Sequence, residues 1–266
     1  MNMNLTSERT VVMKHGRLRD IAGVSDIGPR RRNNEDAIAW DAELGLALVA
    51  DGVGGNNGGE VASSTIVRSI KSDLKTALAG DGKRASARSG EYQSAMVHEL
   101  VRRANQRILA MAARDPKLYG MGATLVVALL VDDGIVVANV GDSRVYRMRD
   151  GVLERLTRDH LLVSDMVERG CLSEEQARSS RSRNVLSRAL GMSGKLEVDV
   201  TRHPLQSGDL YLLCSDGLTG AVSDDELAAH LGNFDVGLRE LAQGAVALAN
   251  RRGGRDNVSA VLMRIT

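Results

Sequence analysis

Several apolar stretches of this 266-residue chain end on an aspartate that is followed by small or polar residues. They are LALVAD ending at Asp51, VVANVGD ending at Asp142 and LYLLCSD ending at Asp216. A fourth aspartate, Asp256, has the reverse order and leads directly into the apolar stretch VSAVLMRI. Stretches of this length and composition predict buried strands, so the pattern predicts four carboxylates at strand ends.

Each aspartate alone has an ordinary explanation, because Asp before Gly is a common turn pair. Glu35 and Asp36, just ahead of the stretch AIAW, bring the number of carboxylates at strand edges to six. Carboxylates that converge repel one another unless a cation lies between them. Oxygen ligands favour a hard divalent ion, so we predict a Mg²⁺ or Mn²⁺ site. Glycine after the aspartate, as at Gly52, lets a backbone carbonyl approach such an ion.

Arg31 lies four residues before Glu35, within RRRNNED. Metal ions and a guanidinium fork together suit a phosphate ester, since they neutralise its charge and bind its oxygens in pairs. Two ions about 4 Å apart can also lower the pKa of a shared water, which then attacks phosphorus. The alternative is that Arg30, Arg31 and Arg32 form only a solvated basic cluster.

The elements occur in blocks along the chain. Helical periodicity covers Glu60–Leu78 and Glu91–Arg114, strands and hairpin turns follow to about residue 157, and two helices precede a last strand. Such blocks predict the α+β class. Because the strands are continuous apolar runs with both faces covered, we expect a four-layer α-β-β-α sandwich with two antiparallel sheets. We expect residues 1–19 to be an N-terminal leader and residues 20–266 a single catalytic domain.

Composition argues against several partners. Aromatic residues are only 2% and the net charge is +1, which gives neither stacking platforms nor a broad positive field for nucleic acid. No apolar run reaches the roughly 18 residues of a membrane span, and no secretory signal is visible. Two cysteines cannot form a disulfide framework. We therefore expect a cytoplasmic protein with no nucleic-acid or membrane partner.

Eight motifs occur in the order seen in bacterial members of the protein phosphatase 2C family, which are metal-dependent Ser/Thr protein phosphatases. They are SDIGPRRRNNED, VADGVGGNNGGEVAS, GATL, VGDSRVY, LTRDH, NVLSRALG, LLCSDGL and GGRDNVSAVL. The resemblance covers roughly residues 20–265. It implies a sandwich of two antiparallel sheets with outer helices, in agreement with the layers predicted from the blocks.

The resemblance also implies how the first metal ligands divide. Asp51 would bridge two ions, and the carbonyl of Gly52 would bind one of them. Asp216 and Asp256 would hold the other ion.

Further roles are implied for four residues. Glu35 and Asp36 match the acidic pair near the second metal, partly through water. Asp142 matches the position linked to a third, weaker metal in bacterial relatives. Arg31 matches the arginine that binds the phosphate. The implied cofactors are two or three Mn²⁺ or Mg²⁺ ions.

The segment from Asp159 to about Arg183 resembles the flap that bacterial members carry beside the site; alternatively it is a surface helix pair without a role. His160 is either a proton donor or a residue that orients a loop. The chain departs from the bacterial pattern at Val53 and Asn56, where Met and His are frequent, and its ARSSRSRN bend lacks a frequent His-Pro.

The leading hypothesis is a Ser/Thr phosphoprotein phosphatase that counteracts a Ser/Thr protein kinase. Its partners would be phosphoserine or phosphothreonine proteins and the kinase itself. The alternatives are a catalytically silent module that binds a phosphopeptide or kinase, and a two-metal phosphodiesterase. A cysteine phosphatase is excluded, because the residue six positions after Cys214 is Gly220 and not the arginine of a phosphate cradle.

Overall fold

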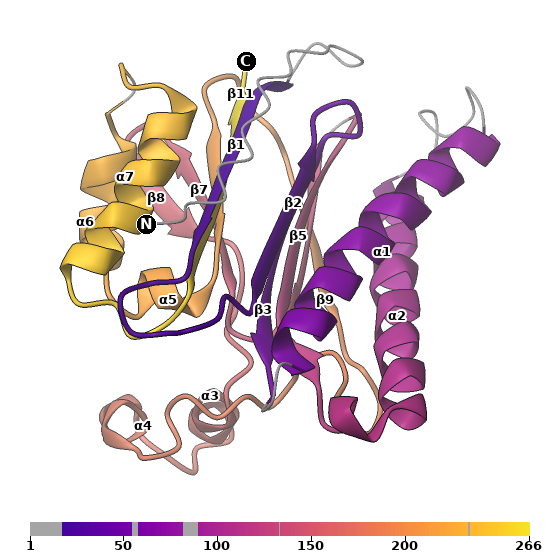
Figure 1. Cartoon of the computed structure of the whole chain (residues 1–266). Helices are drawn as coiled ribbons and strands as arrows, with labels where there is room; N and C mark the ends of the chain where they lie inside the picture. The colour runs from indigo at the N-terminus through magenta and orange to yellow at the C-terminus, as the bar shows by residue number, and fades with distance from the viewer. Residues whose placement is uncertain (1–17, 55–57, 82–89, 133, 234) are drawn as a thin grey trace.

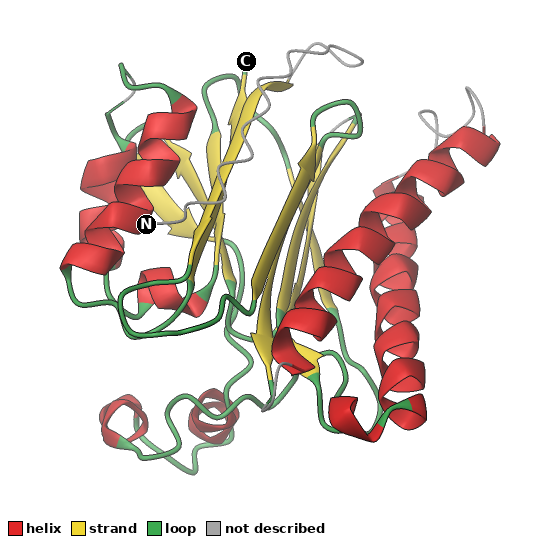
Figure 2. Cartoon of the chain, viewed as in Figure 1, coloured by secondary structure: helices red, strands yellow, loops and turns green. Residues whose placement is uncertain are grey.

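The computed structural model describes residues 18–54, 58–81, 90–132, 134–233 and 235–266. Two antiparallel sheets pack face to face, and helices cover the outer face of each (Figures 1 and 2). These four layers confirm the predicted α+β sandwich. Most of the predicted leader, residues 1–17, and the Asn56 position lie outside the described residues.

One sheet joins the two ends of the described chain. Its strand order is β1 (Leu18–Asp26), β11 (Val258–Ile265), β10 (Leu210–Cys214), β7 (Arg144–Arg149) and β8 (Val152–Arg155). The first and last strands pair along their length, from Leu18 opposite Ile265 to Asp26 opposite Val258. The sandwich is therefore completed only by the last strand of the chain.

The other sheet carries the predicted hairpin. Its order is β2 (Asp36–Asp41), β3 (Leu46–Val53), β5 (Leu125–Val131), β6 (Gly134–Val140) and β9 (Asp199–His203), with the short β4 (Gly122–Ala123) paired to β3. In the β2–β3 hairpin Asp36 lies opposite Asp51. This register brings two of the predicted site carboxylates to the same edge of the sheet.

The helices form two outer layers and one separate lobe. The helices α1 (Gly58–Asp81) and α2 (Gly90–Arg114) cover the β2–β9 sheet, while α5 (Asp216–Thr219), α6 (Asp224–Leu231) and α7 (Leu238–Arg251) lie on the other side. The lobe contains α3 (Leu162–Glu168) and α4 (Glu174–Ser179), beyond one end of the sandwich (Figure 1). A short 3-10 helix, Pro116–Leu118, follows α2. No helix in the described ranges has the length and apolarity needed to cross a membrane.

Alternation along β3 explains why the strands are continuously apolar. Leu46, Leu48 and Ala50 belong to the core between this sheet and the two long helices, whereas Ala47 and Val49 belong to the core between the sheets. Successive side chains of a strand point to opposite faces, and here both faces are covered. All five are almost fully buried.

The core between the sheets generates a stability prediction. Ile135 of β6 is 0% exposed and belongs to this core. We expect Ile135→Ala to lower the free energy of unfolding by about 2–5 kcal/mol, because it removes buried methyl groups and leaves a cavity. Urea denaturation measures the loss. Val152→Ala, at a position 66% exposed, is the control and should cost less than about 1 kcal/mol; equal losses would contradict the packing.

Candidate active site

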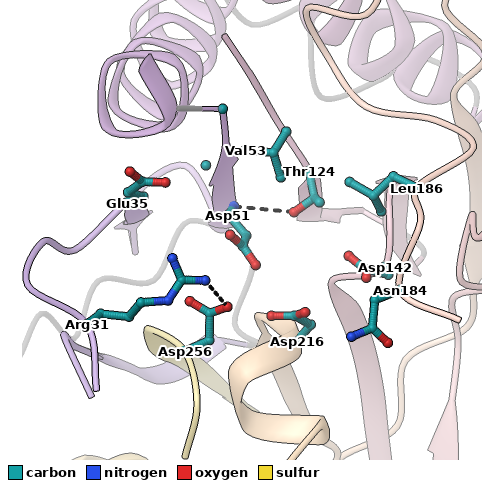
Figure 3. Close-up of a pocket in the computed structure, with 12 residues that line it drawn as sticks. Arg31, Glu35, Asp51, Val53, Thr124, Asp142, Asn184, Leu186, Asp216 and Asp256 are labelled. Carbon is teal, nitrogen blue, oxygen red and sulfur yellow. Dashed lines mark hydrogen bonds and ion pairs between the residues drawn. The ribbon is translucent and has the colours of Figure 1, made fainter. Parts of the chain in front are cut away.

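A pocket of about 280 Å³ opens where β3 ends. Seven of the eight predicted site residues line it, and they come from widely separated parts of the sequence (Figure 3). These seven are Arg31, Glu35, Asp51, Gly52, Asp142, Asp216 and Asp256. The pocket also contacts five residues that we did not select as site residues, namely Val53, Gly54, Thr124, Asn184 and Leu186. The structure thus brings the predicted residues together, while their assignment as metal ligands stays a prediction.

Asp36, the eighth residue, lies behind the pocket and joins the two sheets. Its Oδ2 accepts hydrogen bonds from the hydroxyls of Ser215 at 2.8 Å and Ser259 at 2.7 Å. Ser215 follows β10 and Ser259 lies in β11, so both donors belong to the opposite sheet. The other oxygen, Oδ1, is buried and has no hydrogen-bond partner among the described residues.

Thr124 fixes the end of the strand that carries Asp51. Its backbone N–H donates to the Asp51 carbonyl at 2.8 Å, and its Oγ1 accepts from the Asp51 N–H at 3.3 Å. The same Oγ1 lies 2.7 Å from the hydroxyl of Ser143, the residue after Asp142. Thr124 therefore links two of the aspartate loops. The GATL motif contains it, but nothing in its spacing indicated this role.

Gly52 has a packing reason in addition to the predicted one. A Cβ at this position would lie 2.4 Å from the carbonyl of Gly59, in the first turn of α1, and 2.6 Å from the carbonyl oxygen of Glu35. The Gly52 N–H donates to that Glu35 oxygen at 3.1 Å. Only glycine permits this approach, which holds Glu35 beside the end of β3.

Asp216 is the first residue of α5, a single helical turn that begins directly after β10. Sequence analysis did not predict this helix, because four residues show no periodicity. A Cβ on the next residue, Gly217, would lie 1.9 Å from the carbonyl oxygen of Asn257. Gly217 is therefore required for the close packing that places Asp216 near Asp256.

Asn257 is the functional neighbour that sequence reasoning missed. Its side-chain amide donates to the carbonyls of Ile27 and Asn33, each at 2.9 Å, and its Oδ1 accepts from the Glu35 N–H at 2.9 Å. It is 3% exposed. A buried amide that binds three backbone groups holds the loop that carries Arg31 beside Asp256, and its position in GGRDN was the available signal.

The electrostatics of the cluster are unfavourable without a cation. Burial, with the charges of neighbouring carboxylates, raises the pKa of Asp36 to about 7 and that of Asp142 to about 7. Burial also raises the pKa of Asp51 well above its usual range, and the charges of Asp36 and Asp216 add to the effect. The pKa values of Asp216 and Glu35 are raised, again chiefly by burial. A bound cation would offset both the cost of burying these charges and their mutual repulsion.

The residues present fit divalent ions with oxygen ligands. Besides Asp36, Asp216 has a buried carboxylate oxygen, Oδ1, without a hydrogen-bond partner in the described ranges. Within those ranges no three or more His, Cys, Asp or Glu side chains form a closed metal-binding group. An ion here would complete its shell with the Gly52 carbonyl, water or substrate, as Mg²⁺ commonly does.

Arg31 lies at the edge of the pocket with its guanidinium toward the carboxylates (Figure 3). Its Nη2 is 2.6 Å from Oδ2 of Asp256, and the Arg31 side chain is 48% exposed. The interaction shows that Arg31 is part of the pocket and does not merely belong to a solvated cluster with Arg30 and Arg32.

His160 holds the loop of Asp142 and does not line the pocket. It is 2% exposed, its Nδ1 accepts from the Gly141 N–H at 3.1 Å, and its own backbone N–H donates to the Gly141 carbonyl at 2.9 Å. Because Nδ1 accepts, Nε2 carries the proton and donates to Asp199 at 3.0 Å. These contacts support the loop-orienting role over that of a proton donor.

Comparisons with known proteins show which family the chain belongs to. A family model described as protein phosphatase 2C matches residues 29–250. The serine/threonine phosphatase stp of Listeria monocytogenes is 36% identical over 242 residues, which cover 90% of this chain and 93% of that protein. The chain therefore belongs to the protein phosphatase 2C family, as its motifs predicted.

Solved structures extend the similarity to the fold. The crystal structure of the Mycobacterium tuberculosis serine/threonine phosphatase PstP/Ppp has a TM-score of 0.81 and 35% identity, covering 93% of this chain and 98% of that one. The catalytic domain of PstP in complex with two manganese ions has a TM-score of 0.78 and 34% identity, with coverage of 94% and 99%.

The contacts of His160 generate a test that separates its two ring nitrogens. In His160→Asn, the introduced amide oxygen can replace Nδ1 as the acceptor from Gly141, whereas His160→Gln keeps only a donor toward Asp199. We expect His160→Gln to lower the turnover of p-nitrophenyl phosphate in Mn²⁺ by roughly tenfold, because a displaced Asp142 loop misplaces the site. His160→Asn should retain more activity, and equal turnover in the two variants would contradict a positioning role for Nδ1.

Proposed function

We propose that the chain is a Ser/Thr phosphoprotein phosphatase that hydrolyses phosphomonoesters in this pocket with Mn²⁺ or Mg²⁺. The observation that carries the proposal is the pocket itself, in which five carboxylates and Arg31 meet from distant parts of the sequence. Family membership supports it, and so do the phosphatase names of the relatives. Aspartates at turns would have no reason to share one buried cluster.

The proposed ligands divide the pocket into two sides. Asp51 lies between the two sides. The carbonyl of Gly52 and the carboxylate of Glu35 belong to one side, and Asp216 and Asp256 belong to the other. Bound ions would neutralise the phosphate charge and lower the pKa of a coordinated water. Asp142 is proposed to assist a third, weaker ion.

The residues of the chain position the substrate and the ligands. Arg31 would bind two phosphate oxygens with its guanidinium fork, and the phosphate would take the place of Asp256 as its partner. Asp36 would support the pocket from its buried side, because it holds the edge of the β2–β3 hairpin against Ser215 and Ser259. His160 is buried and already bonded at both nitrogens, so we assign it no proton transfer to substrate.

The proposed catalytic domain includes both sheets and the flap. We propose one catalytic domain over residues 20–266, because β1 and β11, from the two ends of that range, pair within one of the two sheets. The flap of residues 159–183 contains α3 and α4.

Phosphoserine and phosphothreonine proteins and a Ser/Thr kinase are the proposed partners, and the cytoplasm is the proposed location. A silent binding module would be expected to lack ligands, yet every predicted acidic position is filled.

Metal dependence is the first test of this function. The purified chain should hydrolyse p-nitrophenyl phosphate when Mn²⁺ is added, and EDTA should stop the reaction because the carboxylate cluster alone cannot neutralise the phosphate. A thiol-alkylating reagent should leave turnover unchanged, since the exposed Cys171 does not line the pocket and Cys214 is fully buried. Hydrolysis that continues in EDTA would contradict the metal mechanism.

The ligand assignment predicts opposite effects on activity and on metal-free stability. Asp51→Asn and Asp216→Asn should each lower turnover by several orders of magnitude. Each removes a buried charge from a repelling cluster, so the melting temperature of the metal-free variant should equal or exceed that of the wild type. Mn²⁺ should raise the melting temperature of the wild type and not of the variants, as binding to the folded state requires.

Calorimetry with and without Mn²⁺ supplies the second readout. Gln176→Ala, in the exposed helix α4, is a control that should keep the Mn²⁺ response. Near-wild-type turnover in either aspartate variant would show that the ligands are wrongly assigned.

A further inference from the structure

Two exposed arginines without an ionic partner, Arg181 and Arg183, lie three residues and one residue before Asn184, which lines the pocket. Arg181 and Arg183 belong to the turn by which the flap returns to the sandwich, and neither makes an ion pair or side-chain hydrogen bond within the described residues. By contrast, Arg178 pairs with Glu174 at 3.0 Å. The two guanidinium groups are therefore available to a ligand.

Most other charges of the flap are already neutralised within the protein. Asp165 and Glu168 both bind Arg158, and Asp159 binds Arg144. Besides Arg181 and Arg183, only Arg169 and Glu175, one of each sign, have no ionic partner among the described residues of the flap. The net unpaired charge of the flap is thus positive.

Hydrogen-bonded turns connect the two arginines to a residue that lines the pocket. The Arg183 N–H donates to the Ser180 carbonyl at 3.3 Å, and the Val185 N–H donates to the Ser182 carbonyl at 3.0 Å. Such turns keep the Cα atoms of their first and fourth residues within about 7 Å. Asn184, inside the second turn, lines the pocket next to Asp142 and Asp216 in Figure 3.

The turn is anchored to the body of the protein. The Leu162 N–H donates to the Val185 carbonyl at 2.8 Å, and the Ser187 N–H donates to the His160 carbonyl at 2.9 Å. These bonds close the neck of the flap just beyond the two arginines. The backbone that follows the arginines is therefore fixed to the body of the protein, which lowers the cost of ordering their side chains on a ligand.

The position of the arginines indicates what they bind. A peptide in extended conformation advances about 3.3 Å per residue, so arginines on this turn reach positions a few residues from the phosphorylated side chain. Guanidinium groups prefer carboxylates and phosphates. Aromatic residues are only 2% of the chain, so the stacking platforms that single-stranded nucleic acid needs are scarce.

We propose that Arg181 and Arg183 select phosphopeptides that carry an anionic side chain, either a carboxylate or a second phosphate, close to the residue that is dephosphorylated. This inference rests on the proposed function and names the substrate class for the same pocket. It assigns a role to the basic bend ARSSRSRN, whose sequence alone did not give one.

The test compares kcat/KM of the full chain in Mn²⁺ on three phosphothreonine peptides of equal length. One has glutamates beside the phosphothreonine, one has lysines, and one has a second phosphothreonine two positions away. The variant is Arg181→Gln/Arg183→Gln, and the matched control is Arg178→Gln, which removes a paired arginine of the same flap. p-Nitrophenyl phosphate, which has no flanking residues, reports on the catalytic centre alone.

We expect the wild type and the control to prefer the anionic peptides over the lysine peptide by roughly fivefold, the scale of two exposed charge-assisted contacts. The double glutamine variant should lose this preference through KM, with unchanged turnover of p-nitrophenyl phosphate. Arg181→Glu/Arg183→Glu should reverse it, and added salt should weaken it in the wild type. Preference for the doubly phosphorylated peptide alone would identify phosphate as the anion, while preference for both peptides would identify charge.

Other results would overturn the inference. They are a wild type that shows no preference for anionic peptides, a double glutamine variant that keeps this preference, or a control that loses it as the variant does. A variant that loses activity on all three peptides and on p-nitrophenyl phosphate together would also overturn it. Hydrolysis of the peptides in any of these cases would leave the proposed function standing. If p-nitrophenyl phosphate is hydrolysed and no peptide is, the proposed function itself fails and the inference with it.

Discussion

The burial of several carboxylates close to one another is the constraint on which the site of this protein depends. Asp36 and Asp51 lie opposite each other across one hairpin, and burial raises the pKa of both. The remaining structure keeps them together against the cost of burial and their mutual repulsion. The hydroxyls of Ser215 and Ser259 bind Asp36 from the opposite sheet, so the sheets cannot separate without exposing that charge. Without a cation, the clustered carboxylates therefore destabilise the sandwich. With a cation bound, the same carboxylates would stabilise it.

Close backbone packing is the second requirement, and it explains the glycines better than metal access does. Gly52 touches the first turn of α1, and Gly217 touches the carbonyl of Asn257. Both follow a proposed ligand at the end of a strand. A side chain at either position would push the strand end away from its neighbour and move the preceding aspartate. The glycines therefore set the distances between the carboxylates, whether or not a carbonyl also binds an ion.

The layers could be predicted from the sequence because their signals are local. Each of these signals is contained in one continuous stretch of the chain. Examples are the apolar runs at β3 and β10, the helical periodicity before Arg114 and the hairpin at Asp41. The pocket residues could be predicted because acidic strand ends form a repeated pattern. The helix α5 could not, because its four residues show no periodicity. The amide of Asn257 and the hydroxyl of Thr124 could not, since each acts through contacts with residues far away in the sequence. A buried polar residue gives no sign in the sequence of which backbone group it binds.

The base of the flap is bonded to the loop that carries Asp142. His160 binds Gly141 with both its ring and its backbone, and its carbonyl accepts from the backbone N–H of Ser187, on the segment that returns from the flap. Arg144, two residues after Asp142, binds Asp159 at 2.7 Å, at the start of the flap. The loop that presents Asp142 and the base of the flap are thus one bonded unit. A movement of the flap large enough to change its contacts with a substrate would have to break these bonds or carry Asp142 with it, so substrate recognition at the flap and the geometry of the acidic cluster are mechanically linked.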